Sequence, residues 1–383
     1  MHILFLLSLF AVLSLANYRC LGIDAENTFF ANSTISRTSD WSYSVSRSVW
    51  NAPALIALDH LYFLTNQGLV KLDLASGKVL TSNTDLTGRS VPMVSSPPGH
   101  PLRFVILSQQ PNPAQLSIAD ENLNLLHSFN YASVSSMAVK GDSFSFVYHR
   151  IIWQYSFNGI LRFRRSISSN GDLYPSSLGF YLQFSHSVLL LHDDFSTIWE
   201  HRIPYIRAIS FDNKLSRFFV GHYHHTLPDI HMLSIYSAVG PRLIQTYNVS
   251  SNQWPETVRF TAVLKDGSML FGLSAGKRDS DYPLRIGVVP SVASGYGEVR
   301  FIYSVVNAIY QGHTVLDHDV IAVSYFLVDT SETVIVVISV STEVAYEVSR
   351  HSGSGDWIIG FGDHCLAYSI LPTVPNTVYV KCF

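Results

Sequence analysis

The 383-residue chain has few charged residues, few cysteines and no apolar segment of membrane-spanning length. Charged side chains make up 14% of the residues and hydrophobic ones 47%. A chain of this composition buries much of its surface, so intrinsic disorder is excluded. The net charge is −3 and there is no basic run. We therefore expect no nucleic-acid partner and no electrostatic attachment to an anionic membrane.

The apolar run with which the chain begins, Ile3 to Leu15, resembles the core of a signal peptide. It is shorter than the roughly 20 residues of a membrane span. Ser14-Leu15-Ala16 places small residues where a signal peptidase cleaves. We expect residues 1–16 to be removed and the mature chain to be secreted and extracellular; an uncleaved anchor is the alternative. The later stretch Thr333 to Val340 is short and β-branched, which indicates a buried strand and no stable membrane insertion.

Two sequons are compatible with secretion. Asn32-Ser33-Thr34 and Asn248-Val249-Ser250 have no proline in the middle and predict N-glycosylation at Asn32 and Asn248.

The chain contains only three cysteines, and an oxidising compartment allows two of them to pair. Cys365 and Cys382 flank the turn-like sequence LPTVPN symmetrically, so a hairpin would place them opposite each other. Opposed Cβ atoms lie about 4.5–5.5 Å apart and a disulfide prefers about 3.8 Å, so a bridge needs the strands to approach locally. Cys20 then stays free, or instead takes one of these two as its partner.

Short apolar strands alternate with polar turns through most of the chain. The clearest copy is Leu61 to Leu80, LYFLTNQGLVKLDLASGKVL, whose turns contain Asn, Gly or Ser. Looser copies follow at steps that scatter around the ~40–50 residues of propeller blades. The equivalent positions are Tyr62, Phe104, Phe144, Val188, Phe218, Met269, Ile321 and Cys365.

This repetition predicts an all-β protein, a β-propeller of seven or eight blades. A small sheet with two apolar faces cannot bury both alone, whereas a closed ring of sheets leaves no end face exposed. The last unit supplies only two clear strands, so we expect Trp41 to Val49 to add its outer strand. The expected organisation is a signal peptide at 1–16, an N-terminal segment with this ring-closing strand at 17–53, and the propeller at 54–383. Tandem β-sandwiches are the alternative fold.

The segment Leu61 to Leu80 resembles the repeat of pyrroloquinoline-quinone-like propeller proteins, a group within the wider class of WD40-like and YVTN-like repeats. In that repeat a strand ending in Leu-Asp is followed by Ser/Thr-Gly-Lys. Ile151 to Phe163 and Leu189 to Glu200 match it more weakly. The resemblance implies a propeller scaffold. The tryptophan that usually ends the repeat is missing after Leu80, and there is no adjacent-cysteine motif, so no quinone site is expected.

The densest group of potential metal ligands is GHYHHTLPDIH at residues 221–231. His222 and His224 share a face if they lie on one strand. Together with His231 or Asp229 from across the hairpin they would bind a divalent metal, Zn²⁺ or Cu²⁺. The alternative is a polar, aromatic hairpin end. Beyond this metal, the sequence identifies no particular cofactor.

Two acidic groups, His192-Asp193-Asp194 and Asp317-His318-Asp319, suit Ca²⁺ or acid–base chemistry. Aspartates in such positions more often form turns. No G-x-S-x-G or H-E-x-x-H motif and no sialidase box occurs. The absence of these motifs lowers the expectation of an enzyme without excluding one.

We therefore expect a secreted binding or recognition module with a protein or a glycan as its ligand. Several tryptophans lie in or beside polar sequence, where exposed rings bind sugars or proteins; packing between blades is the alternative for them. They are Trp41, Trp50, Trp254 and Trp357. The alternative function is an extracellular hydrolase or oxidoreductase with its site in the central channel.

Overall fold

The computed structural model of the chain describes most of the sequence after residue 40. The described residues are 41–45, 54–65, 68–86, 93–96, 99–108, 115–131, 134, 136–212, 214, 216–224, 230–250, 256–275, 283–292, 295–317, 319–353, 357–362, 365–370 and 376–382. The predicted signal peptide and the sequon at Asn32 lie outside them.

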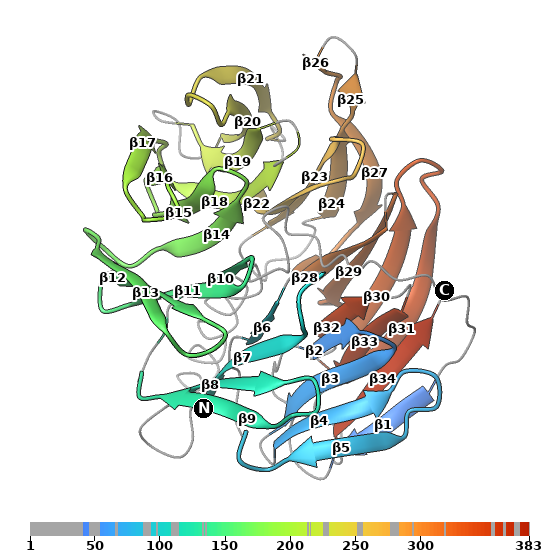
Figure 1. Ribbon diagram of the computed structural model, residues 1–383. Helices are drawn as coiled ribbons and strands as arrows, with labels where there is room; N and C mark the ends of the chain where they lie inside the picture. Colours follow the sequence, from blue (N-terminus) through green and yellow to red (C-terminus); the bar gives the residue numbers. More distant parts are fainter. Residues whose placement is uncertain are drawn as a thin grey trace, which may run out of the picture.

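The described chain forms eight four-stranded antiparallel sheets, here called blades 1 to 8 (Figure 1). Blade 1 comprises β2 (Ala54–Ala57), β3 (His60–Thr65), β4 (Gly68–Asp73) and β5 (Val79–Asn83). Blade 2 comprises β6 (Met93–Ser95), β7 (Arg103–Ser108), β8 (Gln115–Asp120) and β9 (Leu125–Phe129). Blade 3 comprises β10 (Ser136–Lys140), β11 (Ser143–Tyr148), β12 (Ile151–Ser156) and β13 (Leu161–Ser166). Blade 4 comprises β14 (Asp172–Ser176), β15 (Gly179–Gln183), β16 (Ser187–Leu191) and β17 (Thr197–Arg202).

The second half of the chain continues the same order. Blade 5 comprises β18 (Ile206–Asp212), β19 (Arg217–Tyr223), β20 (His231–Ser237) and β21 (Leu243–Asn248). Blade 6 comprises β22 (Glu256–Val263), β23 (Met269–Ala275), β24 (Leu284–Val289) and β27 (Arg300–Val305), with the small hairpin β25 (Ser291–Val292) and β26 (Gly295–Tyr296) inserted. Blade 7 comprises β28 (Ala308–Asp317), β29 (Val320–Leu327), β30 (Glu332–Ser339) and β31 (Ala345–Ser352). Blade 8 comprises β32 (Trp357–Gly362), β33 (Cys365–Ile370), β34 (Asn376–Cys382) and β1 (Trp41–Val45).

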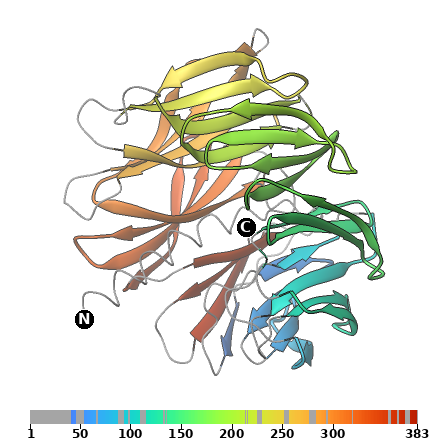
Figure 2. The same cartoon turned by 90° about the vertical axis from the view of Figure 1, so that its left-hand side faces the viewer.

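The sheets stand next to one another around a central axis (Figures 1 and 2). The innermost strands make the contacts between blades: β2 lies against β32, β6 against β10, β10 against β14, β18 against β22, and β28 against β32. The first and last blades therefore meet. The fold is a β-propeller, as the repeat predicted, and tandem sandwiches are excluded.

Aromatic side chains fill the spaces between neighbouring blades. The rings of Tyr62 in blade 1 and Phe104 in blade 2 are 4.6 Å apart, and those of Tyr181 in blade 4 and Phe211 in blade 5 are stacked at 3.9 Å. All four side chains are almost completely buried. Burial of one such side chain stabilises the fold by roughly 1.5–3 kcal/mol. Aromatic residues thus contribute to the packing between blades.

Blade 8 joins the two ends of the described chain. β1 pairs antiparallel with β34, from Trp41 opposite Val380 to Val45 opposite Asn376. It is the edge strand of this blade, where the sequence analysis placed Trp41 to Val49. In the same blade Cys365 lies opposite Cys382, and Cys365 is disulfide-bonded.

One blade position was wrong in the sequence analysis. Seven of the eight equivalent residues lie on the second strand of their blades, but Val188 lies on β16, the third strand of blade 4. The second strand there is β15, so Phe180 is the true equivalent. The steps on either side become 36 and 38 residues, which removes the irregular short step.

All described elements are strands, and no helix that could cross a membrane occurs among the residues that the structure describes. The apolar stretch near residue 335 is β30, whose central residues are buried.

Candidate functional site

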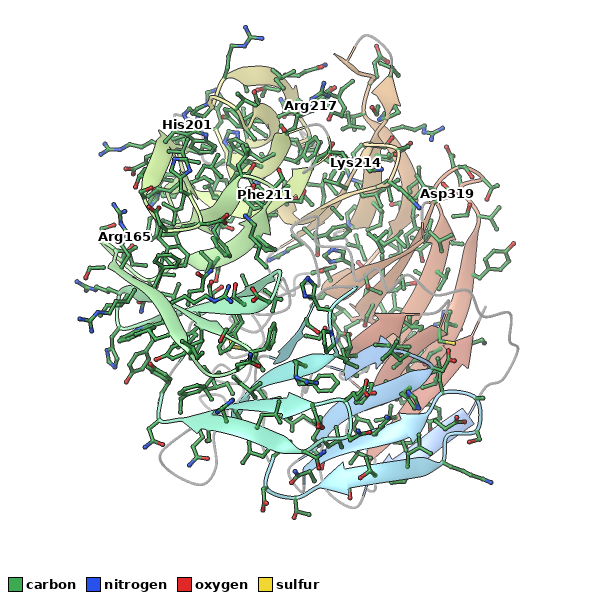
Figure 3. All side chains as sticks on the ribbon, in the orientation of Figure 1. Arg165, His201, Phe211, Lys214, Arg217 and Asp319 are labelled. Carbon is green, nitrogen blue, oxygen red and sulfur yellow. The ribbon has the colours of Figure 1, made fainter. Side chains whose placement is uncertain are left out.

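One face of the ring, here called the entry face, is the face at which the innermost strand of each blade begins. Because the strands of a blade are antiparallel, the second strand ends and the third strand begins at this same face. The turns between first and second strands lie at the opposite face. Lys214, Arg217 and Asp319, labelled in Figure 3, belong to that opposite face.

The innermost strands of blades 5 to 8 each contain a β-bulge close to the entry face. The register shifts between Ile206 and Ala208 in β18, between Val258 and Phe260 in β22, between Tyr310 and Gly312 in β28, and between Ile358 and Gly360 in β32. A bulge leaves one residue outside the ladder and redirects its side chain. The bulged residues are Arg207, Arg259, Gln311 and Ile359.

Arg207 is exposed and held by an aromatic residue of its own blade. Its Nη2 donates a hydrogen bond of 2.8 Å to the hydroxyl of Tyr223, and its Cζ lies 4.6 Å from the centre of that ring. Tyr223 also packs against His231, with the ring centres 4.4 Å apart. The guanidinium is therefore positioned by a hydrogen bond and by a cation–π contact.

Tyr205 lies directly before β18 and completes this part of the entry face. Its backbone has φ +52°, a left-handed conformation that is strained for a bulky residue. Tyr205 is 57% exposed, and the centre of its ring lies 6.3 Å from the centre of the Tyr223 ring. The Tyr205 N–H donates to Nδ1 of His186, 3.3 Å away. A large exposed ring in a strained conformation points to a functional role.

Arg259 comes from the innermost strand of the next blade and is partly buried. Burial lowers the pKa of its guanidinium, the neighbouring Tyr223 raises it, the positive charge of Arg207 lowers it, and Tyr310 raises it. Two arginines from adjacent blades thus lie close enough to affect each other, with two tyrosines beside them.

Tyr310 is fixed by its neighbours. Its hydroxyl is hydrogen-bonded to Nδ1 of His313 at 2.7 Å, and the ring of His313 stacks on Phe260 at 3.9 Å. We call the group Tyr205, Arg207, Tyr223, Arg259 and Tyr310 the arginine–tyrosine site. Its chemistry offers hydrogen-bond donors, positive charge and aromatic surface, which suits recognition of a ligand.

The histidines that the sequence analysis grouped as metal ligands are not brought to one point. His222 lies opposite Met232, and Tyr223 lies opposite His231, so His222 and His231 face opposite sides of blade 5. Both ring nitrogens of His222 have protein partners, the carbonyl of Tyr223 and the hydroxyl of Ser234, each at 2.8 Å. Burial lowers the pKa of His222. His224 is partly buried at the end of β19, and Asp229 lies outside the described residues.

The aspartates of the acidic groups whose side chains the structure describes serve turns at the opposite face, and His318 lies outside the described residues. Asp194 accepts hydrogen bonds from the backbone and hydroxyl of Ser196, and Asp193 pairs with Lys140. Asp319 accepts from the backbone N–H of Ser341. Their turn interpretation is therefore the one that the geometry supports. No group of three or more metal-ligating side chains is found in the described parts of the chain.

Asp172, on the innermost strand of blade 4, carries a carboxyl group with a raised pKa. Asp172 is the first residue of β14 and is partly buried. Burial raises the pKa of this carboxyl to about 6.

Asn248 ends β21, the outermost strand of blade 5, and is exposed. Its side-chain oxygen accepts a hydrogen bond from the backbone of Ser250, and the hydroxyl of Ser250 accepts one from the backbone of His231. Glycosylation at Asn32 and Asn248 and the pairing of Cys365 with Cys382 stay predictions.

The arginine–tyrosine site was missed from the sequence. A signal was present: Arg207, Arg259 and Gln311 follow one another at intervals of 52 residues. The apolar residues that reveal the repeat lie on the second strands, whereas these three polar residues lie on the innermost strands.

Comparisons with known proteins give the fold. No family model and no curated protein matches the chain. Among solved structures, the C-terminal WD40 domain of Sif2 is similar with a TM-score of 0.60 and 10% identity, covering 89% of this chain and 99% of that one. The Dos1 propeller has a TM-score of 0.57 and 8% identity, covering 94% and 97%. The propeller domain of Cps50 (Swd1) from Myceliophteria thermophila has a TM-score of 0.51 and 12% identity, covering 73% and 93%. These likenesses establish a β-propeller whose structural neighbours include WD40 propellers.

Proposed function

We propose that this protein is a secreted recognition module that binds another protein through the arginine–tyrosine site. The observation that carries the proposal is the exposed ring of Tyr205 beside Arg207, which is fixed on Tyr223. Tyrosine and arginine are enriched among the residues that dominate binding energy at protein interfaces. WD40 propellers commonly serve as protein-interaction modules, which supports this assignment.

Secretion is part of the proposal. The apolar run from Ile3 to Leu15 with its small-residue cleavage site supports it, as do the sequons and the disulfide bond at Cys365. The segment Leu61 to Leu80 resembles pyrroloquinoline-quinone-like repeats. As part of this proposal, that resemblance supports a common origin of the blade and those repeats.

Site-specific crosslinking tests the binding face. A photoreactive amino acid such as benzoylphenylalanine replaces Tyr205 in one variant and Val239 in the other, and each is expressed as the full chain. Val239 is 74% exposed and lies in the turn of the same blade at the opposite face. We expect a discrete protein adduct from position 205 and none from 239. Equal adducts from both positions, or none from 205, would contradict the proposal.

A glycan is the second candidate ligand, because an exposed tyrosine beside an arginine also stacks on a sugar ring. A glycan array probed with the full chain and with Tyr205→Ala distinguishes the two. Binding of defined glycans that Tyr205→Ala abolishes would favour this second candidate.

A further inference from the structure

The arginine–tyrosine site contains two positively charged side chains, and a neutral ligand would not interact with their charge. Arg207 and Arg259 come from adjacent blades and occupy equivalent bulges, so both residues lie outside their ladders near the same face. The charge of Arg207 reaches Arg259 strongly enough to lower its pKa. Both arginines thus contribute to one patch of the entry face.

Holding Arg259 charged in this place costs free energy. Burial, the largest cause, lowers its pKa, and the like charge of Arg207 lowers it too. These two effects outweigh Tyr223 and Tyr310, which raise its pKa. Both effects disfavour the charged form, and an anion placed near both arginines would favour it. The patch is therefore better suited to a negatively charged group than to a neutral one.

The donors are arranged to receive such a group. A guanidinium carries five N–H donors in a planar fork, and the hydrogen bond from Nη2 to Tyr223 uses one of those on Arg207. That bond, and the ring on which the guanidinium lies, fix its orientation. A pre-oriented fork is the geometry in which arginine binds a carboxylate or a phosphate through two hydrogen bonds.

Access to the patch is open on the side of blade 5. Arg207 and Tyr205 are both exposed, and Tyr205 and Tyr223 supply aromatic surface next to the charged groups. An extended peptide could lay its backbone against these rings and direct one side chain toward the arginines.

We propose that Arg207 and Arg259 together bind one oxyanion, the carboxylate or phosphate of an acidic side chain in the partner protein. This inference rests on the proposed function and adds the chemistry that the partner must present. Tyr205 and Tyr223 contact the residues flanking the acidic one.

The test uses labelled pools of random peptides of about twelve residues, whose central residue is fixed as Glu, phosphoserine or Gln. Affinity for the full chain is measured by fluorescence anisotropy. We expect the Glu or the phosphoserine pool to bind at least about tenfold more tightly than the Gln pool, and the comparison of the two identifies the oxyanion.

The variants Arg207→Gln and Arg259→Gln should each abolish this preference. Arg242→Gln is the matched control, because Arg242 is exposed in the same blade but at the opposite face. Arg207 is a surface residue, so Arg207→Gln carries the test even if Arg259→Gln fails to fold.

Equal binding of all three pools, or no binding of any, would overturn the oxyanion inference. The three pools could bind wild type with equal affinity while Tyr205→Ala lowers the affinity for all of them alike. That result would support the binding face and contradict only its preference for an oxyanion. The crosslinking experiment decides the proposed function independently of the pools.

Discussion

Arg207 and Arg259 hold the same position in two neighbouring blades: each is the bulged residue near the start of the innermost strand, and 52 residues separate them. The ring places repeated strands side by side, so a residue that recurs at the repeat distance gathers at one face. A pair of guanidiniums that are distant in sequence is thereby assembled by the repeat itself.

Tyr205→Gly is expected to separate stability from binding. The substitution relieves a left-handed conformation that costs about 1–2 kcal/mol. It also removes the ring contacts, and it stabilises the unfolded state by about 0.5–1 kcal/mol because glycine increases the conformational entropy of the unfolded chain. We expect the free energy of unfolding in urea to stay within about 1 kcal/mol of wild type, while crosslinking or peptide binding is lost. The control is Tyr346→Gly, since Tyr346 in β31 is also exposed, at 64%, but lacks a positive φ. That control should destabilise the chain, and a similar loss at Tyr205 would refute the assignment of strain.

Asp172 is expected to make stability depend on pH. Its folded pKa of about 6 lies above the usual 3.8, so the folded state binds the proton more tightly than the unfolded state. Stability should therefore fall as pH rises from about 4 to about 6, by at most about 3 kcal/mol. In Asp172→Asn this fall should be absent, and the variant should be more stable than wild type at pH 7. The free energy of unfolding in urea, measured at a series of pH values, tests both expectations.

Asp194→Asn is the control with the opposite sign. The Ser196 hydrogen bonds hold the pKa of Asp194 below its usual value, so the stability it contributes is present at neutral pH and is lost as pH falls below about 4. Asp194→Asn should be the less stable variant at pH 7 and should converge on wild type in acid. Identical pH profiles for wild type and Asp172→Asn would contradict the placement of Asp172.

The bridge predicted between Cys365 and Cys382 should stabilise blade 8. Closing a loop of about 15 residues contributes about 3 kcal/mol, so Cys382→Ser and Cys365→Ser should each lower the free energy of unfolding by a similar amount. Cys20→Ser should leave it unchanged. Mass spectrometry of peptides from the unreduced protein identifies the pair, and a Cys20–Cys365 linkage would show the prediction to be wrong.

Removal of β1 should destabilise blade 8 and expose the edge of its sheet. A chain beginning at residue 46 leaves the edge of β34 unpaired, and an unpaired edge promotes association with other chains. We expect a lower melting temperature and larger particles in light scattering than for a chain beginning at Trp41. If both chains are equally stable and monomeric, the closing strand is dispensable.

The sequon at Asn248 offers two substitutions with different consequences. Asn248→Gln and Ser250→Ala should both remove a glycan. Each variant should then have a lower mass than the untreated wild type, as the wild type does after glycosidase treatment. Ser250→Ala also removes the hydroxyl that accepts from the backbone of His231, which should cost about 1 kcal/mol more. If neither variant changes the mass of the secreted chain, the site is not glycosylated.

The sequence predicted the architecture because each blade repeats apolar second strands and Asx- or Gly-bearing turns. Blade 4 was misaligned because β14 contains Pro175, and Pro is unusual inside a strand. Its hairpin instead depends on Gly179, whose φ of +144° and closeness to the Leu191 carbonyl exclude any side chain.

The candidate site was less predictable, because it depends on register. Whether His231 shares a face with His222 changes with a shift of one residue, and the sequence does not specify that shift. The meeting of Arg207 with Arg259 likewise requires a bulge in both strands, and neither bulge leaves a distinct local signal.

The pairing of β1 with β34 also determines the order in which the protein can be completed. Trp41–Val45 emerges early during synthesis, whereas its partner Asn376–Cys382 follows about 330 residues later. Blade 8 therefore cannot assemble until nearly the whole chain has been made. Until then the innermost strands of the first and last blades expose apolar surface. A chain must therefore close its ring before it encounters another unclosed chain, because the exposed surfaces would associate.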